Sequence, residues 1–174
     1  PNQFKSAVIT PILKKPSFDS NALKNFRPVA NLLFVSKVVE KAVALQISTY
    51  LEKNDLNDVY QSAYKKCHST ETALLPVQND LLIALDSGCS VFLLMLDLTA
   101  ALDTIDHSIM LYTLANRFGI KGKTLQWFEL YLSYRRQAVV VNTKSSSWYE
   151  LPFGVPQGSV LGPILFTLHI SPNW

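Results

Sequence analysis

Two segments about fifty residues apart constrain this chain more than any other feature. The first, VFLLMLDLTAALDTIDH, runs from Val91 to His107, and the second, GVPQGSVLGP, runs from Gly154 to Pro163. The first begins as an apolar run of strand length that delivers one carboxylate, Asp97, at its end. The second is a Gly- and Pro-punctuated loop that enters an apolar, helix-like stretch. Together the two segments predict a site for a metal ion and a nucleotide.

The charged residues are distributed unevenly along the 174-residue chain. Residues 1–66 hold ten Lys and Arg against five Asp and Glu, residues 67–116 hold six Asp and Glu and no Lys or Arg, and residues 117–174 hold six against two. Basic flanks can bind phosphate backbones, and central carboxylates can hold metal ions. The layout therefore favours a nucleic-acid partner, with ordinary surface charge as the alternative.

Composition limits the class of protein. A hydrophobic content of 48% is enough for one sizeable core and argues against disorder. The two cysteines, Cys67 and Cys89, have neither the number of a disulfide framework nor the spacing of a zinc site. We find no signal segment and no apolar stretch long enough to span a bilayer, so we expect a soluble, intracellular protein with no membrane partner. The chain starts at Pro1 and ends at Trp174 after an apolar run, and we expect it to be a piece of a larger polypeptide.

Hydrophobic periodicity and turn residues predict a mixed α and β fold. AVITPILKKP predicts a short strand broken by Pro11 and Pro16, followed by a loop that reaches Pro28. Val91–Asp97 predicts a second strand, and residues 137–142 and 148–153 predict a hairpin. Helices are predicted over residues 31–53, from Ser69 toward Asp86, over 107–118, over 124–134, and from near Gly158 onward.

The amino-acid sequences of these segments resemble the reverse transcriptase domain of non-LTR (LINE-type) retrotransposons, in which motifs like DLSAAFDTIDH and GVPQGSVLGP recur in this order. The resemblance also covers NFRPVANLLFVSKVVEK, QSAYKKCHSTETAL, WFELYLSYRRQ and PILF, and thus nearly the whole chain. It implies an α+β, right-hand polymerase fold with fingers over 1–88, palm over 89–118, a fingers return and hairpin over 119–155, and a truncated palm over 156–174. No Asp-Asp pair occurs in the sequence, and we expect the chain to lack the catalytic Asp-Asp hairpin and the thumb of the family.

The resemblance also assigns roles at the metal and the sugar. Asp97 matches a metal ligand, and the carbonyl of Leu98 lends a further oxygen to the ion. An aspartate that only caps a turn is the alternative for Asp97. Leu102 stands where the family has an aromatic ring that packs under the sugar. Asp103 and Asp106 recur in the family phrase, but we interpret both as helix-capping residues before His107.

Further roles concern the nucleotide. Gln157 matches a glutamine beside the sugar of the incoming nucleotide and the template base, and Gly158 permits close approach of the backbone. Arg27 and Lys14 match positions that contact the triphosphate, and Lys15 is an alternative to Lys14. A solvated lysine pair is the ordinary interpretation of these two lysines.

The function implied is RNA-directed DNA polymerase activity, with Mg²⁺ or Mn²⁺ as cofactor. The enzyme would transfer a nucleotidyl group from a dNTP to the 3′-hydroxyl of a DNA primer on an RNA template, in the nucleus for the parent element. With one metal aspartate in place of three, we expect the fragment itself to be inactive. A non-catalytic nucleic-acid-binding remnant of a decayed element and a structural helper are the alternatives. Oligomeric state does not follow from the sequence.

Overall fold

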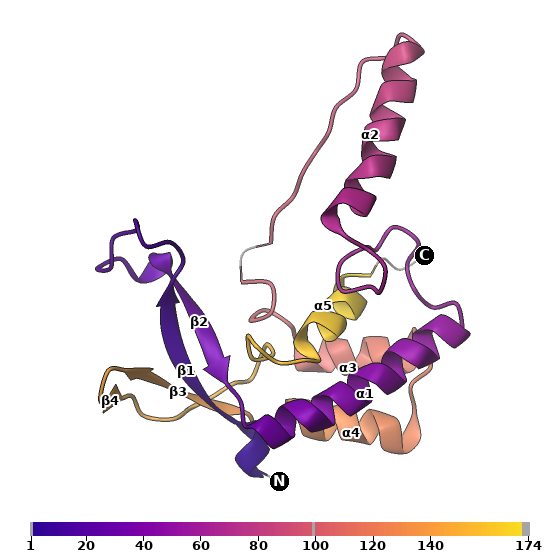
Figure 1. Ribbon diagram of the computed structural model, residues 1–174. Coiled ribbons are helices and arrows are strands. Elements are labelled where there is room, and N and C mark those ends of the chain that lie inside the picture. The colour runs from indigo at the N-terminus through magenta and orange to yellow at the C-terminus, as the bar shows by residue number, and fades with distance from the viewer. Residues whose placement is uncertain (1, 99, 172–174) are drawn as a thin grey trace. The chain divides into compact units, whose positions relative to one another are not determined.

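The computed structural model describes residues 2–98 and 100–171. The chain divides into two compact units, one formed by Pro1–Leu56 with Ala100–Trp174 and the other by Asn57–Thr99 (Figure 1). The first unit contains a mixed sheet and a group of helices, in agreement with the α+β class predicted from the sequence. Among the described residues, no helix combines the length and the apolar character needed to cross a membrane.

The sheet of the first unit is built around β1. Strand β1 (Ser6–Leu13) pairs antiparallel with β2 (Phe26–Asn31) and parallel with β3 (Arg136–Val141). Strands β4 (Lys144–Ser145) and β5 (Tyr149–Glu150) both pair antiparallel with β3, so the predicted hairpin is confirmed. Short 3-10 helices η1 (Asn2–Lys5) and η2 (Leu23–Asn25) precede β1 and β2.

The predicted break of the first strand at Pro11 is wrong, because β1 continues to Leu13. Strand β3 pairs only with residues 6–9 of β1, so Pro11 lies where β1 has a single neighbour. There it stands opposite Pro28 of β2, and neither proline has an N–H to donate. The loop predicted to reach Pro28 is likewise wrong from Phe26 onward, where β2 begins.

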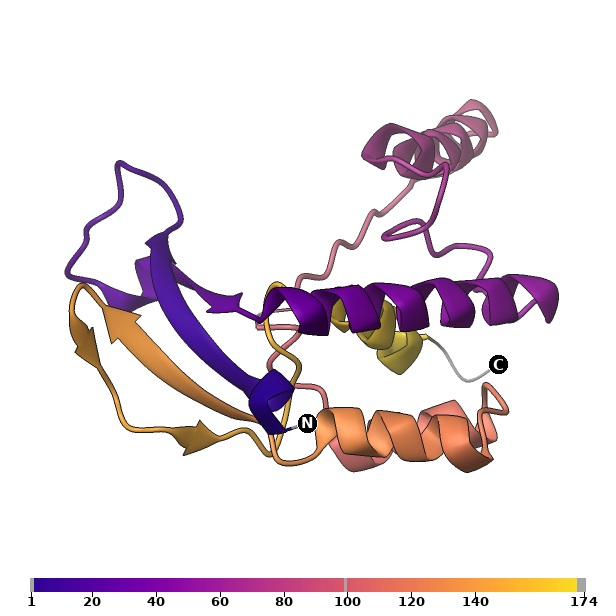
Figure 2. The same cartoon turned by 60° about the horizontal axis from the view of Figure 1, so that its bottom comes forward.

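Four helices of the first unit share one core. They are α1 (Phe34–Lys53), α3 (His107–Asn116), α4 (Gly122–Leu132) and α5 (Gly162–Ile170). Figure 2 shows α1 on one side, α3 with α4 on the other, and α5 between them. The fully buried core side chains include Met110, Leu114, Phe118, Phe128, Leu161 and Leu165. The predicted helices are confirmed to within a few residues, except that α5 begins at Gly162 instead of near Gly158.

Local capping explains where α3 begins. The carboxylate of Asp106 accepts hydrogen bonds from the backbone N–H groups of Ser108 (2.8 Å) and Ile109 (3.0 Å). These are two of the N-terminal donors that a helix cannot satisfy internally. The predicted capping role of Asp106 is confirmed.

The second unit contains one long helix and an extended segment. Helix α2 (Thr70–Asp86) begins at a capping box, in which the Ser69 hydroxyl accepts from Thr72 N–H (3.2 Å) and the Thr72 hydroxyl accepts from Ser69 N–H (2.8 Å). The strand predicted over Val91–Asp97 is wrong, because residues 91–98 form no ladder with any described strand. A strand sequence without a neighbouring backbone gains no ladder hydrogen bonds, so high β-propensity alone does not make it a strand.

Candidate functional site

The two segments that dominate the sequence are joined by backbone hydrogen bonds at their nearest points. Gly154 N–H donates to the carbonyl of Ile105 (2.7 Å), and Val155 N–H donates to the carbonyl of Leu102 (2.8 Å). An isolated antiparallel bridge pairs Asp106 with Phe153 next to these bonds. Residues 102–106 and 153–155 therefore form one local structure, although about fifty residues separate them in the chain.

Gly154 permits this close approach. Its φ of +79° lies in the left-handed region, and a Cβ placed on it would lie 2.8 Å from both Cα and the carbonyl oxygen of Asp103. Side chains cannot fit at that distance without a shift of the Asp103 backbone. The sequence predicted close backbone approach to a nucleotide at Gly158, whereas Gly154 approaches a second segment of the protein.

The next residues of the loop contact strand β2. The N–H of Ala30 donates to the Gln157 carbonyl (2.9 Å), and a Cβ on Gly158, at φ +106°, would lie 3.1 Å from the Ala30 carbonyl oxygen. Gly158 thus turns the chain close against the sheet. These contacts fix the backbone of Gln157 between β2 and the 102–106 segment.

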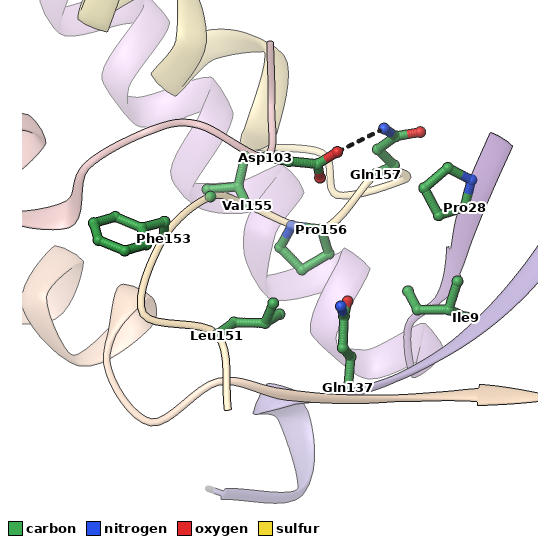
Figure 3. Close-up of a pocket in the computed structure, with 10 residues that line it drawn as sticks. Ile9, Pro28, Asp103, Gln137, Leu151, Phe153, Val155, Pro156 and Gln157 are labelled. Carbon is green, nitrogen blue, oxygen red and sulfur yellow. Dashed lines mark hydrogen bonds between the residues drawn. The ribbon is translucent and has the colours of Figure 1, made fainter. Parts of the chain in front are cut away.

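Gln157 lies beside a pocket of about 150 Å³ within the first unit. Figure 3 shows Asp103 and Gln157 side by side at this pocket. Ile9, Pro28 and Gln137 line it from strands β1, β2 and β3 of the sheet, and Leu151 lines it from the segment that follows β5. The remaining lining residues are Phe153, Gly154, Val155 and Pro156. The pocket is therefore formed by the sheet and by the two segments singled out in the sequence.

The Asp103 side chain contacts Gln157 at this pocket. The Gln157 Nε2 amide donates to Asp103 Oδ2 at 3.4 Å, a long hydrogen bond. Desolvation raises the pKa of the Asp103 carboxyl above its usual range, and the Gln157 hydrogen bond acts in the opposite direction. The predicted capping role of Asp103 is wrong, since the cap of α3 is Asp106 and the carboxylate of Asp103 meets Gln157 instead.

His107 contacts the Gly154 loop, a role that no sequence motif predicted. Its Nε2 lies 2.8 Å from the Gly154 carbonyl oxygen, so the ring holds the first residue of the loop from the other side. The histidine belongs to the DTIDH motif, but nothing in the local sequence pattern indicates a hydrogen-bond partner 47 residues away.

Leu102 packs against the helical core and is half buried. Its backbone carbonyl accepts the Val155 hydrogen bond, so the position predicted to lie under the sugar is fixed close to Gln157 by the same local structure. Leu102, Gln157 and Gly158 are thus predicted site residues that the structure brings into one region.

Arg27 and Lys14 lie near the same end of the β1–β2 pair. Arg27 stands opposite Ile12 in the register, and Lys14 follows β1 directly. The Lys14 ammonium donates to the Lys24 carbonyl (2.8 Å), whereas no described residue forms a hydrogen bond with the exposed Arg27 guanidinium. Because successive side chains of a strand point to opposite faces, we expect Arg27 to leave β2 on the face opposite Pro28, which lines the pocket.

Asp97 and Leu98 lie in the extended segment of the second unit, where both are exposed. The joint site for a metal ion at Asp97 and a nucleotide at Gln157, which the two segments predict, stays a prediction. Among residues 2–98 and 100–171, no three His, Cys, Asp or Glu side chains are grouped as a metal site requires. Asp97 with the Leu98 carbonyl does not make a complete site for Mg²⁺, which is bound by several oxygen ligands.

Comparison with known families identifies the two joined segments. The family described as reverse transcriptase (RNA-dependent DNA polymerase) matches residues 12–172, which include both segments and the whole pocket except Ile9. The chain belongs to the reverse transcriptase family. The resemblance to reverse transcriptases of non-LTR elements predicted from the sequence is confirmed.

Two curated relatives of this reverse transcriptase chain come from mobile elements. It is 31% identical to the probable RNA-directed DNA polymerase from transposon X-element of Drosophila melanogaster, over 97% of this chain and 18% of that protein. It is 29% identical to the RNA-directed DNA polymerase from mobile element jockey of the same species, over 98% of this chain and 18% of that protein. The chain therefore spans about a fifth of the length of these relatives.

Proposed function

We propose that this chain carries the nucleotide-contacting part of an RNA-directed DNA polymerase, the enzyme class that extends a DNA primer on an RNA template with dNTPs. The observation that supports this most is the joining of residues 102–106 to residues 153–155, which places Gln157 and Asp103 at one pocket. A glutamine amide held by its own backbone and by a carboxylate is preorganised to bind a polar ligand.

We assign complementary roles to the residues around this pocket. Gln157 contacts the sugar of the incoming nucleotide and the template base, with Gly158 allowing the backbone to approach. Leu102 packs under the sugar. It lacks a flat ring, so exclusion of ribonucleotides is weaker than with an aromatic residue at this position.

The triphosphate needs cations from outside the pocket. Arg27 is exposed and offers a guanidinium fork suited to phosphate oxygens. Because it leaves β2 on the face opposite the pocket, the triphosphate must extend beyond the pocket to meet it. Lys14 or Lys15 adds a second charge, although Lys14 must first give up its hydrogen bond to Lys24. Both lysines lie at the end of the β1–β2 pair to which Arg27 belongs.

We infer that Asp97 and the Leu98 carbonyl provide part of a site for Mg²⁺ or Mn²⁺. Such an ion, when bound, neutralises the triphosphate charge and activates the primer hydroxyl. The described residues do not complete the site, so the 174-residue chain alone should extend no primer. The division into fingers (1–88 and 119–155) and palm (89–118 and 156–174) and a nuclear site of action belong to the same proposal.

A second candidate function is nucleic-acid binding without synthesis. It is favoured by Leu102 in place of a ring and by the absence of three grouped metal-ligating side chains among the described residues. Residues 1–66 hold ten Lys and Arg against five Asp and Glu, and residues 117–174 hold six against two, so these two basic segments would hold the phosphate backbone.

Primer extension separates the two functions. A chimera of the X-element polymerase, in which residues 1–174 replace the matching segment, is tested on poly(rA) with an oligo(dT) primer. The polymerase proposal predicts extension by the chimera and its loss on Asp97→Asn, because an amide keeps the shape but lacks the charge that holds the ion. A folded chimera that binds the hybrid without extending it supports the second function. Extension by the Asp97→Asn variant would show that the metal site is elsewhere.

Nucleotide binding by the chain itself gives a further test of Gln157. We expect Gln157→Ala to raise the Kd of dTTP about fivefold, in a buffer with Mg²⁺ and a poly(rA)·oligo(dT) hybrid whose primer is chain-terminated, since about one hydrogen bond is lost. Gln46→Ala, an exposed glutamine of α1, is the matched control and should leave the Kd unchanged. Equal values for both variants would refute the role of Gln157.

A further inference from the structure

Glu40 is a buried carboxylate that the proposed reaction does not use. It lies on the face of α1 that packs inward, with the other buried residues Ser36, Ala44, Ile47 and Leu51. Only 1% of its surface is exposed. A carboxylate in such a place costs folding free energy unless hydrogen bonds replace its water. Its hydrogen-bond partners therefore indicate what it does.

Two of the hydrogen-bond partners of Glu40 are backbone groups of the loop that carries Gln157. Its Oε2 accepts from Val160 N–H at 2.7 Å and from Leu161 N–H at 3.4 Å. Its Oε1 accepts from the Ser36 hydroxyl at 3.4 Å. Val160 and Leu161 immediately precede α5, where backbone N–H groups have no partner inside the helix and the helix dipole favours a negative charge. Glu40 thus caps α5 from a different helix, 120 residues away in the sequence.

The hydroxyl of Ser159 completes the same cap. Ser159 Oγ accepts from Gly162 N–H at 2.8 Å and lies 3.0 Å from the Tyr131 hydroxyl. Tyr131 is buried beneath the Arg135 guanidinium, whose Cζ lies 4.1 Å from the ring centroid. Burial raises the pKa of Tyr131 to about 12, so its hydroxyl keeps its proton. The Ser159 side chain and Glu40 therefore hold three successive N–H groups at the end of the loop.

The loop is consequently fixed at both ends. At its first residue, Gly154 is held by Ile105 and His107. At its last residues, Val160 and Leu161 are held by Glu40. Gln157 lies midway between these fixed points.

We propose that Glu40 is a positioning residue for Gln157, setting the place of the nucleotide-contacting loop by holding the backbone at Val160. This inference rests on the proposed function of Gln157. Glu40 does not line the pocket, so it acts through the loop backbone that it holds. Its removal should loosen the loop and weaken nucleotide binding, while the surface that binds nucleic acid stays unchanged.

The direct test is amide hydrogen exchange of the loop, measured by NMR. Glu40→Gln keeps the shape of the side chain and removes its charge. We expect the Val160 amide to exchange about tenfold faster or more, because a hydrogen bond to a charged acceptor is among the stronger ones. Glu52→Gln, an exposed glutamate of the same helix, is the matched control and should change nothing at Val160. Unchanged exchange in Glu40→Gln would overturn the inference.

The functional test is a double-mutant cycle on the Kd of dTTP, with the hybrid described above. If Glu40 acts by placing Gln157, Glu40→Gln should raise the Kd about fivefold in the wild-type chain and have no further effect beside Gln157→Ala. Additive effects, or no effect of Glu40→Gln when Gln157→Ala weakens binding, would overturn the inference alone. A Kd that Gln157→Ala leaves unchanged would overturn the proposed function and the inference with it.

A second variant keeps the test decisive if Glu40→Gln fails to fold. Glu40→Asp retains the charge but withdraws the carboxylate from Val160 by one methylene group. It should reproduce the faster exchange and the weaker dTTP binding, with an unchanged Kd for the hybrid itself. A Glu40→Asp protein that binds dTTP as the wild type does would refute a positioning role.

Discussion

Replacing Gly154 with alanine should destabilise the first unit more than any other single methyl addition to a glycine of this chain. Two physical effects add at this position. A residue with Cβ at φ +79° costs about 1 to 2 kcal/mol in the left-handed region. The new Cβ would also lie 2.8 Å from Cα and the carbonyl oxygen of Asp103, and relieving such an overlap costs about 1 to 3 kcal/mol more.

The sum, about 2 to 5 kcal/mol, converts to a fall in Tm of about 5 to 15 °C for a domain of this size. The measurement is thermal unfolding followed by circular dichroism. Gly122→Ala is the matched control, since Gly122 has φ +60° but nothing within 4 Å of the position that the new methyl group would occupy. Gly122→Ala is destabilised only by the cost of the left-handed backbone conformation. The lower conformational entropy of the unfolded chain stabilises both variants equally.

The difference between the two variants isolates the contact between residues 103 and 154. If Gly154→Ala and Gly122→Ala lowered Tm by the same amount, the close approach of the two segments would be refuted. The joining of these segments supports the proposed function, so that result would also remove its main support.

Two further predictions concern pH. The pKa of Tyr131 is raised to about 12, so above pH 10 the unfolded chain loses this proton before the folded chain does. The free energy of unfolding should therefore fall by about 1.4 kcal/mol per pH unit up to the raised pKa. Urea titrations at several pH values measure this fall, and Tyr131→Phe should remove it. Asp103 also has a raised pKa, so stability should decline slightly as pH rises from its ordinary value through the raised one, and Asp103→Asn, which can still accept from Gln157, should remove that decline.

Local signals in the sequence predicted the helices well. The spacing of apolar residues over 31–53 predicted α1. The capping residues Ser69 and Asp106 predicted where α2 and α3 begin. These features depend on residues within one or two turns of each other. A single sequence contains all the information that they need.

The strands were predicted less well because strands depend on partners. Strand β2 was not predicted, because Arg27 and Pro28 were assigned to a loop. Only the register, which places Pro28 opposite Pro11, explains why a proline there removes no hydrogen bond of the ladder. Val91–Asp97 has the composition of a strand but no partner among the described residues. Propensity and pairing are separate requirements, and the sequence displays only the first.

The candidate site shows the same division. Family wording predicted Gln157, Gly158 and Leu102, and the structure brings them into one region. The resemblance could not reveal that Asp103 contacts Gln157 or that Glu40 binds the Val160 N–H, since these contacts join residues 54 and 120 positions apart. Long-range contacts of buried polar groups become visible only when the fold is known.

The exposed apolar segment 91–98 makes a last prediction about the isolated chain. Phe92 is 97% exposed, Leu94 80% and Leu96 83%, in a run whose only charge is Asp97. An unpaired, apolar strand sequence is a template for pairing with another chain. We therefore expect concentration-dependent association in sedimentation velocity, which Leu94→Lys with Leu96→Lys should suppress. Leu23→Lys with Leu45→Lys is the control, because it adds the same charge at exposed leucines outside the run. Equal suppression by both pairs would show that net charge, and not strand pairing, governs association.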